Sequence, residues 1–358
     1  MQQQTQIVNY KCPNCGAPME FGIASQKWEC HFCESSFSLE ELPKIEAQEG
    51  SERPEGPEQA TWVPETFQDH ETVAYTCPDC GGKVLADRNT ASTFCPYCHS
   101  PTVIAGRLSG EYRPARVLPF QLGKEQAVES LLKLCKKKPF LPRAFRQYVE
   151  KGEITGLYVP YWLFSCTLHS FLQGTGKRVQ TWSDSRYRYT KTDVYQVERA
   201  ANIPFQLLPV DGSSRMDDRL MESIEPFDYS KLQTFNMQYL SGHFAESFDV
   251  DSKTSSQRFF QRAQSAAQDI LRGSANGYSS LTVNSCTHRQ SGLDNIYVML
   301  PVWMISVKFK GKIYTYAMNG QSGKSSGKLP MSMGRFFAWF GGFAAVFSAI
   351  AMLGGMFL

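Results

Sequence analysis

Eight cysteines, arranged as two copies of one pattern, constrain this chain more than any other feature of its sequence. Each copy is a CxxC pair, fourteen residues and a second CxxC pair, and the copies lie 65 positions apart. Tetrahedral zinc takes four thiolates from two short loops, and a hairpin with CxxC at each end supplies them. The spacing therefore predicts two zinc ribbons, each with one structural Zn2+. The predicted ligands are Cys12, Cys15, Cys30 and Cys33 in the first ribbon, and Cys77, Cys80, Cys95 and Cys98 in the second.

Other uses of these cysteines are weaker readings of the same pattern. Disulfides would suit a secreted mini-domain, but the first residues lack a basic stretch followed by an apolar one. Thiolates also bind iron, as in rubredoxin, or exchange in a redox-active CxxC. A redox CxxC normally stands alone at the start of a helix, whereas these pairs flank segments suited to a hairpin. His31 and His99 lie beside ligands in the two copies, and we expect both to be bystanders.

The last 23 residues, 336–358, carry no charge. A helix of this length would measure roughly 34 Å, which is enough to cross the core of a bilayer. Basic residues in a juxtamembrane segment, 321–335, favour a cytoplasmic flank. The pattern predicts a transmembrane helix and a single-pass, tail-anchored protein of the cell membrane, with the bulk of the chain cytoplasmic. Gly341, Ala345 and Ala349 recur every four residues, a stripe of small residues that would allow close packing with a neighbouring helix in the membrane.

The charge of the chain is unevenly distributed. The net charge is only +3, but residues 1–70 carry four Lys and Arg against twelve Asp and Glu, whereas residues 111–358 carry thirty against nineteen. Binding to phosphates depends on Lys and Arg, so the acidic front argues against nucleic acid as the partner of the first ribbon. The basic rear would be attracted to the anionic head groups of a lipid bilayer.

Composition and periodicity predict an α+β fold of several parts. With 42% hydrophobic residues, the chain can bury a sizeable core. Strand patterns at 156–169, 186–200 and 296–309 predict a mixed antiparallel sheet, with the first strand turning at 173–177. Helical spacing of apolar residues predicts helices ending near the lysines at 133–138 and covering 252–271. The predicted organisation is zinc ribbon 1 (1–39), an acidic flexible linker (40–71), zinc ribbon 2 (72–110), an α+β body (111–320), the basic segment (321–335) and the transmembrane helix (336–358).

Several motifs together resemble one family. The CPNCG and CPDCGG knuckles, LYVPYWLF, YLSGHFAESFDVD and the terminal apolar span are similar to bacterial membrane-anchored proteins with zinc ribbons of the transcription factor IIB type. The resemblance implies a protein without established catalytic activity that recruits partners at the cytoplasmic face of the membrane. It also implies a role in envelope stress, with a membrane-stress or flotillin-like protein as the partner.

One acidic cluster is the best candidate for catalysis. It comprises Asp211, Asp217, Asp218, Glu222, Glu225 and Asp228. Because a DG turn, a first helical turn and a helix restart explain these acids, we expect a structural role and no enzyme activity. The sequence favours a membrane-tethered zinc-ribbon adaptor that binds protein partners. The alternative is a membrane-held nucleic-acid-binding regulator that uses the ribbons or the lysine cluster at 133–138.

Overall fold

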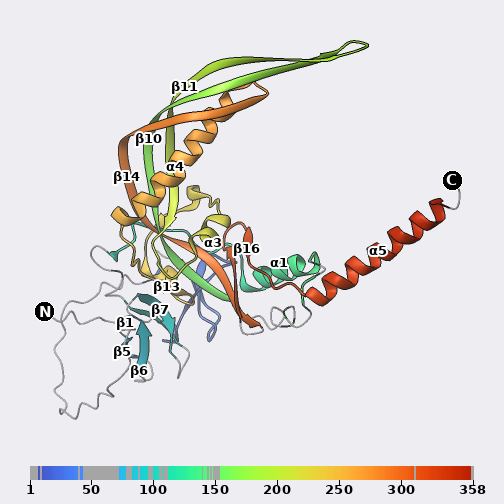
Figure 1. Ribbon diagram of the computed structural model, residues 1–358. Helices are drawn as coiled ribbons and strands as arrows, with labels where there is room; N and C mark the ends of the chain where they lie inside the picture. Colours follow the sequence, from blue (N-terminus) through green and yellow to red (C-terminus); the bar gives the residue numbers. More distant parts are fainter. Residues whose placement is uncertain are drawn as a thin grey trace, which may run out of the picture.

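The computed structural model is built mainly of β-strands, most of which belong to one eleven-stranded sheet (Figure 1). It describes residues 7–8, 10–38, 41–42, 72–77, 83–87, 89–95, 100–104, 108, 112–138, 140–142, 145, 147, 154–309 and 312–355. The predicted acidic linker, 40–71, lies outside the described residues except for Glu41 and Leu42.

The large sheet contains strands from almost the whole length of the chain. Its strands are β1 (Ile7–Val8), β7 (Thr90–Phe94), β8 (Pro101–Ile104), β9 (Arg116–Val117), β10 (Thr155–Ser183), β11 (Arg188–Asp211), β12 (Gln233–Thr234), β13 (Phe244–Glu246), β14 (Ser280–Phe309), β15 (Lys312–Asn319) and β16 (Ser325–Gly327). Two small sheets contain β2 (Glu20–Gly22), β3 (Lys27–Glu29) and β4 (Ser36–Phe37), and β5 (Thr72–Thr76) and β6 (Lys83–Asp87). The helices are α1 (Lys124–Lys136), α3 (Asp218–Ser223), α4 (Ser252–Ser274) and α5 (Met333–Gly355), with short 3-10 turns η3 (Tyr229–Lys231) and η4 (Met237–Leu240).

Three very long strands form an arm that projects from the rest of the molecule (Figure 1). The central strand, β10, pairs antiparallel with β11 on one side and with β14 on the other. Helix α4 packs along the arm, and Phe259 on this helix stacks on Phe164 of β10 with 5.0 Å between ring centroids. Beyond α4 the strands continue to a narrow tip between β10 and β11, where most side chains are exposed.

Two prolines lie inside these strands, where proline would normally remove a hydrogen bond from the sheet. Pro160 lies between Tyr158, the last residue of β10 paired with β13, and Tyr161, the first paired with β11. Pro301 likewise lies between the part of β14 that pairs with β9 and the part that pairs with β15. Each proline therefore lies where a strand changes its neighbour, so a missing N–H on that side costs no bond of the ladder.

The structure corrects the predicted fold class. The predicted helices at 252–271 and before the lysine cluster are confirmed by α4 and α1. The strands, however, run through the segments that were expected to end them, so β-structure predominates and the prediction of an α+β fold with a C-terminal transmembrane helix is wrong. The turn predicted at 173–177 is also wrong, because β10 continues to Ser183.

The prediction of a transmembrane helix at 336–358 also needs correction. Over the part of the chain that the structure describes, no helix combines the length and the apolar character needed to cross a bilayer. Helix α5 covers Met333–Gly355, with Gly334 and Arg335 in its first turn. The single-pass cell-membrane location inferred from this helix is therefore withdrawn.

Candidate metal centre

The first CxxC pair and the second are held in matching backbone turns. In the first, the Gly16 N–H donates to the Cys12 carbonyl at 2.8 Å, and in the second the Glu34 N–H donates to the Cys30 carbonyl at 2.9 Å. Both donors have positive φ, +73° at Gly16 and +57° at Glu34. The hairpin β2–β3 joins the two turns and brings them face to face. The sequence spacing thus produces two similar knuckles on one small sheet.

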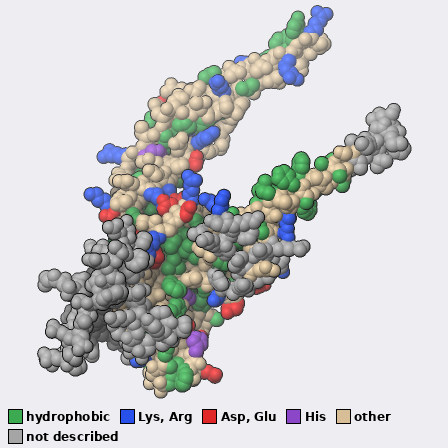
Figure 2. Space-filling view, turned by 60° about the horizontal axis from the view of Figure 1, so that its bottom comes forward, with side chains coloured by type: hydrophobic (Ala, Val, Ile, Leu, Met, Phe, Trp, Pro, Cys, Tyr) green, Lys and Arg blue, Asp and Glu red, His purple; other side chains and the backbone are tan. Residues whose placement is uncertain are grey.

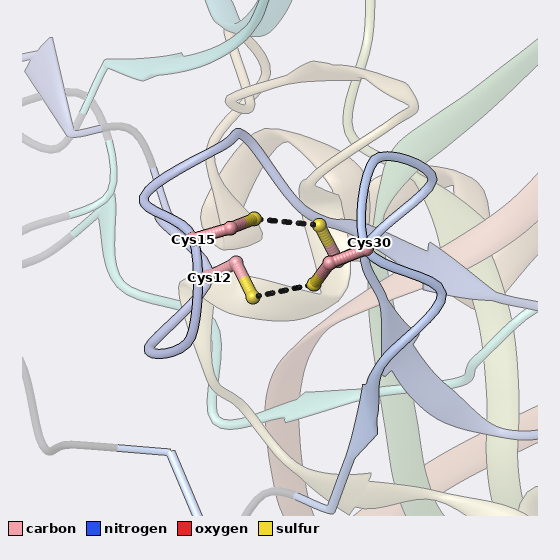
Figure 3. A group of neighbouring side chains, drawn as sticks. Cys12, Cys15 and Cys30 are labelled. Carbon is pink, nitrogen blue, oxygen red and sulfur yellow. Dashed lines mark hydrogen bonds between the residues drawn. The ribbon is translucent and has the colours of Figure 1, made fainter.

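The four cysteines of the first copy converge on one point. Their sulfur atoms all lie within 4.8 Å of one another. Sγ of Cys12 is 3.5 Å from Sγ of Cys33, and the same distance separates Cys15 and Cys30. Figure 3 shows Cys12 and Cys15 on one loop pointing toward Cys30 on the other. Tetrahedral zinc with bonds of about 2.3 Å places its sulfurs about 3.8 Å apart, so this set can bind one metal ion.

The protonation of these thiols is linked to their neighbours. Two hydrogen bonds with Ser35, the stronger effect from its side chain and the weaker from its backbone, lower the pKa of the Cys33 thiol to about 6. At Cys15 a backbone hydrogen bond from Ala17 lowers the pKa, but desolvation and the other thiols outweigh it and raise the pKa to about 12. A metal ion binds thiolates, so its binding would release protons from this cluster. His31 is not part of the cluster; its Nε2 lies 3.7 Å from Glu20 Oε2.

The first ribbon is packed against the body rather than held apart from it. Its Phe21 and Trp28 rings lie 5.1 and 5.2 Å from the ring of Tyr239 in η4. Trp28 Nε1 donates to the Gln238 carbonyl at 3.1 Å, and the Ser241 hydroxyl donates to the Met19 carbonyl at 2.6 Å. Two cysteines of the cluster, Cys12 and Cys30, belong to the same hydrophobic core as the β10 side chains. The sequence spacing predicted the four-cysteine cluster but not this docking, because the contact residues lie far apart in the chain.

The second copy is described only in part. Cys77 and Cys95 are buried and pack together, whereas Cys80 and Cys98 lie outside the described residues. The Cys95 N–H donates to the Ser100 carbonyl at 3.0 Å, and the equivalent bond 65 positions earlier joins Cys30 and Ser35 at 2.9 Å. Among the described residues one four-cysteine cluster is present. The second metal site stays a prediction.

Four acids of the cluster near α3 pair with two arginines of α4. The Arg258 guanidinium donates to Asp211 at 3.0 Å and to Glu222 at 2.7 Å, and it also pairs with Asp218. Arg262 binds Glu225 at 2.6 Å. The two remaining acids, Asp217 and Asp228, accept hydrogen bonds as caps of α3 and η3. These contacts give each acid a structural partner, and burial raises the pKa of Asp211 to about 6.

The lysine cluster at 133–138 lies at the carboxyl end of α1, where cations interact favourably with the helix dipole. Lys133 Nζ also pairs with Glu129 Oε1 at 2.9 Å, one turn earlier on the same helix.

One exposed residue was missed by the sequence reasoning. Phe32, between the ligands Cys30 and Cys33, is 82% exposed. Its position between the two cysteines of a CxxC pair was the sequence feature that could have predicted an exposed ring.

Comparisons with known proteins give one informative relative. No family model matches this chain, and no solved structure matches it. The uncharacterized protein YdjG of Bacillus subtilis (strain 168) is 32% identical over 356 residues, which cover 98% of this chain and 100% of the relative. The similarity therefore extends over the ribbons, the arm and the carboxyl-terminal helix together.

Proposed function

We propose that this chain, which belongs to the same family as YdjG of Bacillus subtilis, is a zinc-ribbon adaptor that binds a protein partner through its first ribbon. The observation that carries the proposal is the convergence of four sulfurs within 4.8 Å on a ribbon that is anchored in the main core. A closed set of four thiolates leaves no open position for substrate, so the metal has a structural role. Its role is to fix the two knuckles as a rigid surface.

Zinc is the metal that this ligand set favours. Four thiolates on two knuckles suit tetrahedral Zn2+, whereas hard cations such as Mg2+ and Ca2+ prefer oxygen ligands. A second zinc in the other ribbon is supported by the repeated cysteine spacing and by the matching Cys95 to Ser100 hydrogen bond. Its ligands would be Cys77, Cys80, Cys95 and Cys98. We therefore expect two zinc ions in the complete chain.

The exposed ring of Phe32 supports a protein as the partner. Large exposed apolar side chains on a rigid loop are typical anchors of protein interfaces. Phe32 is 82% exposed although its neighbour Cys30, two residues earlier, is buried. Exposed Glu34 and half-buried Glu20 and Glu29 lie on the same ribbon, and these carboxylates would repel phosphates. The ribbon surface thus suits a partner that offers an apolar pocket rather than a nucleic acid.

Site-specific crosslinking tests this proposal. A photo-reactive residue placed next to Phe32, for example at His31, would be activated in cells and the linked protein identified by mass spectrometry. We expect one protein whose yield falls at least about tenfold with Phe32→Ala, because anchor residues contribute about 2 kcal/mol or more. Leu293→Ala, an equally apolar exposed residue on β14, serves as the matched control and should leave the yield unchanged. The family resemblance makes a flotillin-like or other membrane-stress protein the first candidate.

Nucleic acid is the competing outcome. If the ribbons or the lysine cluster bound phosphates, the full chain would bind a random oligonucleotide with an affinity that falls steeply as salt rises. Such binding, with no protein linked at the Phe32 surface, would contradict the adaptor function and favour a nucleic-acid-binding regulator. Loss of binding in Lys136→Ala and Lys137→Ala variants would then identify α1 as the site.

A further inference from the structure

The outer edge of β11 has no partner strand in the part of the chain that the structure describes. Along its whole length β11 pairs with β10 alone. Towards the body the edge is interrupted by Pro204 and Pro209, which lack an N–H. From Arg188 to Ile203, however, the strand contains no proline and projects away from the body (Figure 2). This distal edge therefore offers a row of main-chain donors and acceptors that no proline interrupts.

A free edge of this length is unusual. Soluble proteins keep edge strands short or cover them, because a long open edge pairs readily with another chain. Here the edge also carries apolar side chains, since Val194 is 61% exposed and Tyr195 is 39% exposed. Main-chain pairing favours a β-strand as the occupant over a nucleic acid. The pattern of charges along the edge indicates which strand.

We propose that the distal edge of β11 pairs antiparallel with the same edge of a second copy of this chain, about a twofold axis at Gln196. Around such an axis every residue faces the residue equally far on the other side of Gln196 in the second copy. Asp193 then faces Arg199, so the axis creates two ion pairs of opposite charge. Tyr195 faces Val197 and Tyr189 faces Ile203, but Val197 and Ile203 are already buried in a single copy, so the ion pairs carry the register.

This register avoids charge conflicts that two nearby registers create. It aligns residues 189–203 of both copies, which is nearly the whole proline-free run. A twofold axis at Tyr195 would place Lys191 opposite Arg199, and one at Asp193 would place that carboxylate opposite itself. Like charges directly opposite each other destabilise a strand pair. An axis at Gln196 avoids both conflicts.

The residues of the proposed ion pairs are accessible in a single copy. Asp193 has a side chain that is 31% exposed and contacts Lys191 at 3.2 Å. Arg199 is half-buried and donates to the neighbouring Glu198 carbonyl at 2.8 Å, a contact within its own strand. Because the paired arms would run in opposite directions, the two bodies would lie at opposite ends of the joint sheet.

Charge reversal tests the register. The full chain would be studied by sedimentation velocity over a range of concentrations, in a mild non-ionic detergent because α5 exposes large apolar side chains. We expect a dimer whose dissociation constant rises about tenfold or more with Arg199→Asp, which sets two carboxylates opposite each other. The double variant Asp193→Arg with Arg199→Asp restores both pairs and should return the constant to within about threefold of the wild type.

A zero-length crosslink provides a second readout. In the variant Arg199→Lys, a carbodiimide can join the introduced amine to the Asp193 carboxylate only where the two side chains touch. Within one strand six residues span about 20 Å, so the link must join two copies. A mixture of 14N- and 15N-labelled chains should give mixed-isotope peptides containing this link.

Two results would overturn the inference. One is a chain that stays monomeric at every concentration. The other is a dimer that is insensitive to both charge variants and lacks the crosslink, because another surface such as α5 would then hold it together. The metal and the adaptor function are not involved in this contact, so zinc content and Phe32 crosslinking remain separate tests.

Discussion

The indole nitrogen of Trp28 donates a hydrogen bond to the backbone carbonyl of Gln238, at 3.1 Å and across 210 positions of sequence. Trp28 lies on β3, two residues before the ligand Cys30, whereas Gln238 belongs to the 3-10 turn η4 of the body. Both residues are buried. The bond therefore connects the ribbon that contains the four-cysteine cluster to the body, and the two should be stabilised together.

Trp28→Phe should weaken this connection. The substitution keeps an aromatic ring beside Tyr239 but removes one of the two donors to the buried Gln238 carbonyl, which still accepts from the Ser241 N–H at 3.2 Å. Loss of one such hydrogen bond costs about 0.5 to 1.5 kcal/mol in the free energy of unfolding. Urea denaturation monitored by circular dichroism measures the change. Phe32→Ala, on the exposed tip of the next knuckle, should change stability by less than about 0.5 kcal/mol; equal losses in both variants would show that the Trp28 bond contributes nothing.

His243 should make the folded state sensitive to acid. Burial between Phe120 and Trp303 lowers the pKa of His243 to about 4, from an ordinary value of 6.5. Between these values the unfolded chain binds the proton more strongly, so stability is lost as pH falls from 6.5 toward 4. His243→Phe keeps an aromatic ring beside Phe120 and removes the loss of stability that comes from protonation of His243. The wild type should lose about 2 kcal/mol more than the variant between about pH 7 and about pH 5, as measured by urea unfolding at both values.

Arg258 should be essential because of the carboxylate it neutralises. Arg258→Met leaves Asp211, whose side chain is 2% exposed, without its counter-charge, and breaking a buried pair in this way costs about 3 to 5 kcal/mol. Adding Asp211→Asn removes the unpaired charge and should recover more than about 1 kcal/mol. The loss in Arg258→Met should shrink at low pH, because burial already raises the pKa of Asp211 to about 6. Additive losses in the thermal unfolding of the double variant would contradict a direct coupling.

Asn319 at the end of β15 should be as important as a core residue. Its amide nitrogen donates to the carbonyls of Ile224 and Pro226, both at 3.1 Å. Its side-chain oxygen accepts from the backbone N–H groups of Gln321 and Ser322. Asn319→Leu leaves these groups unpaired and should lower the free energy of unfolding by about 2 to 4 kcal/mol. Asn284→Leu, an exposed asparagine on β14, is the control, and a similar small effect in both would argue against the network.

Local features of the structure were predictable from sequence. The four-cysteine cluster of the first ribbon follows from the CxxC spacing, because each knuckle is closed by bonds within six residues. Helix α4 follows from its apolar periodicity, and Asp251 caps it by accepting from the Thr254 N–H. Both features depend on neighbours in sequence, so a pattern of residues is enough to reveal them.

The arm was not predictable in this way. Gly174 and Gly176 indicated a turn, but in the structure they lie inside β10 where other groups approach closely. A Cβ at Gly174 would lie 2.7 Å from the Thr282 carbonyl oxygen, and one at Gly176 would lie 2.6 Å from the Tyr278 ring. The absence of a side chain at these glycines allows close contact with a segment about a hundred positions away. Sequence periodicity carries no information on such contacts, which is also why the strand content was underestimated.

The docking of the first ribbon was hidden for a related reason. The acidic linker and the repeated cysteines suggested two similar units on a tether, and the domain boundaries drawn from them stay predictions. The contacts of Phe21, Trp28 and Met19 with η4 and Ser241 join residues more than two hundred positions apart. An aromatic residue in a ribbon strand fits an exposed platform and a buried anchor equally well. Only the fold distinguishes these roles.

The most direct test of the account is the zinc content of the full chain, purified without chelator and measured by inductively coupled plasma mass spectrometry beside Cys12→Ser and Cys135→Ser. Cys135 is buried in α1, away from either cysteine copy in the sequence, and controls for loss of a cysteine as such. We predict two zinc ions per chain in the wild type and in Cys135→Ser, and one in Cys12→Ser. A content near zero in the wild type, or an unchanged content in Cys12→Ser, would contradict a metal centre at the first ribbon.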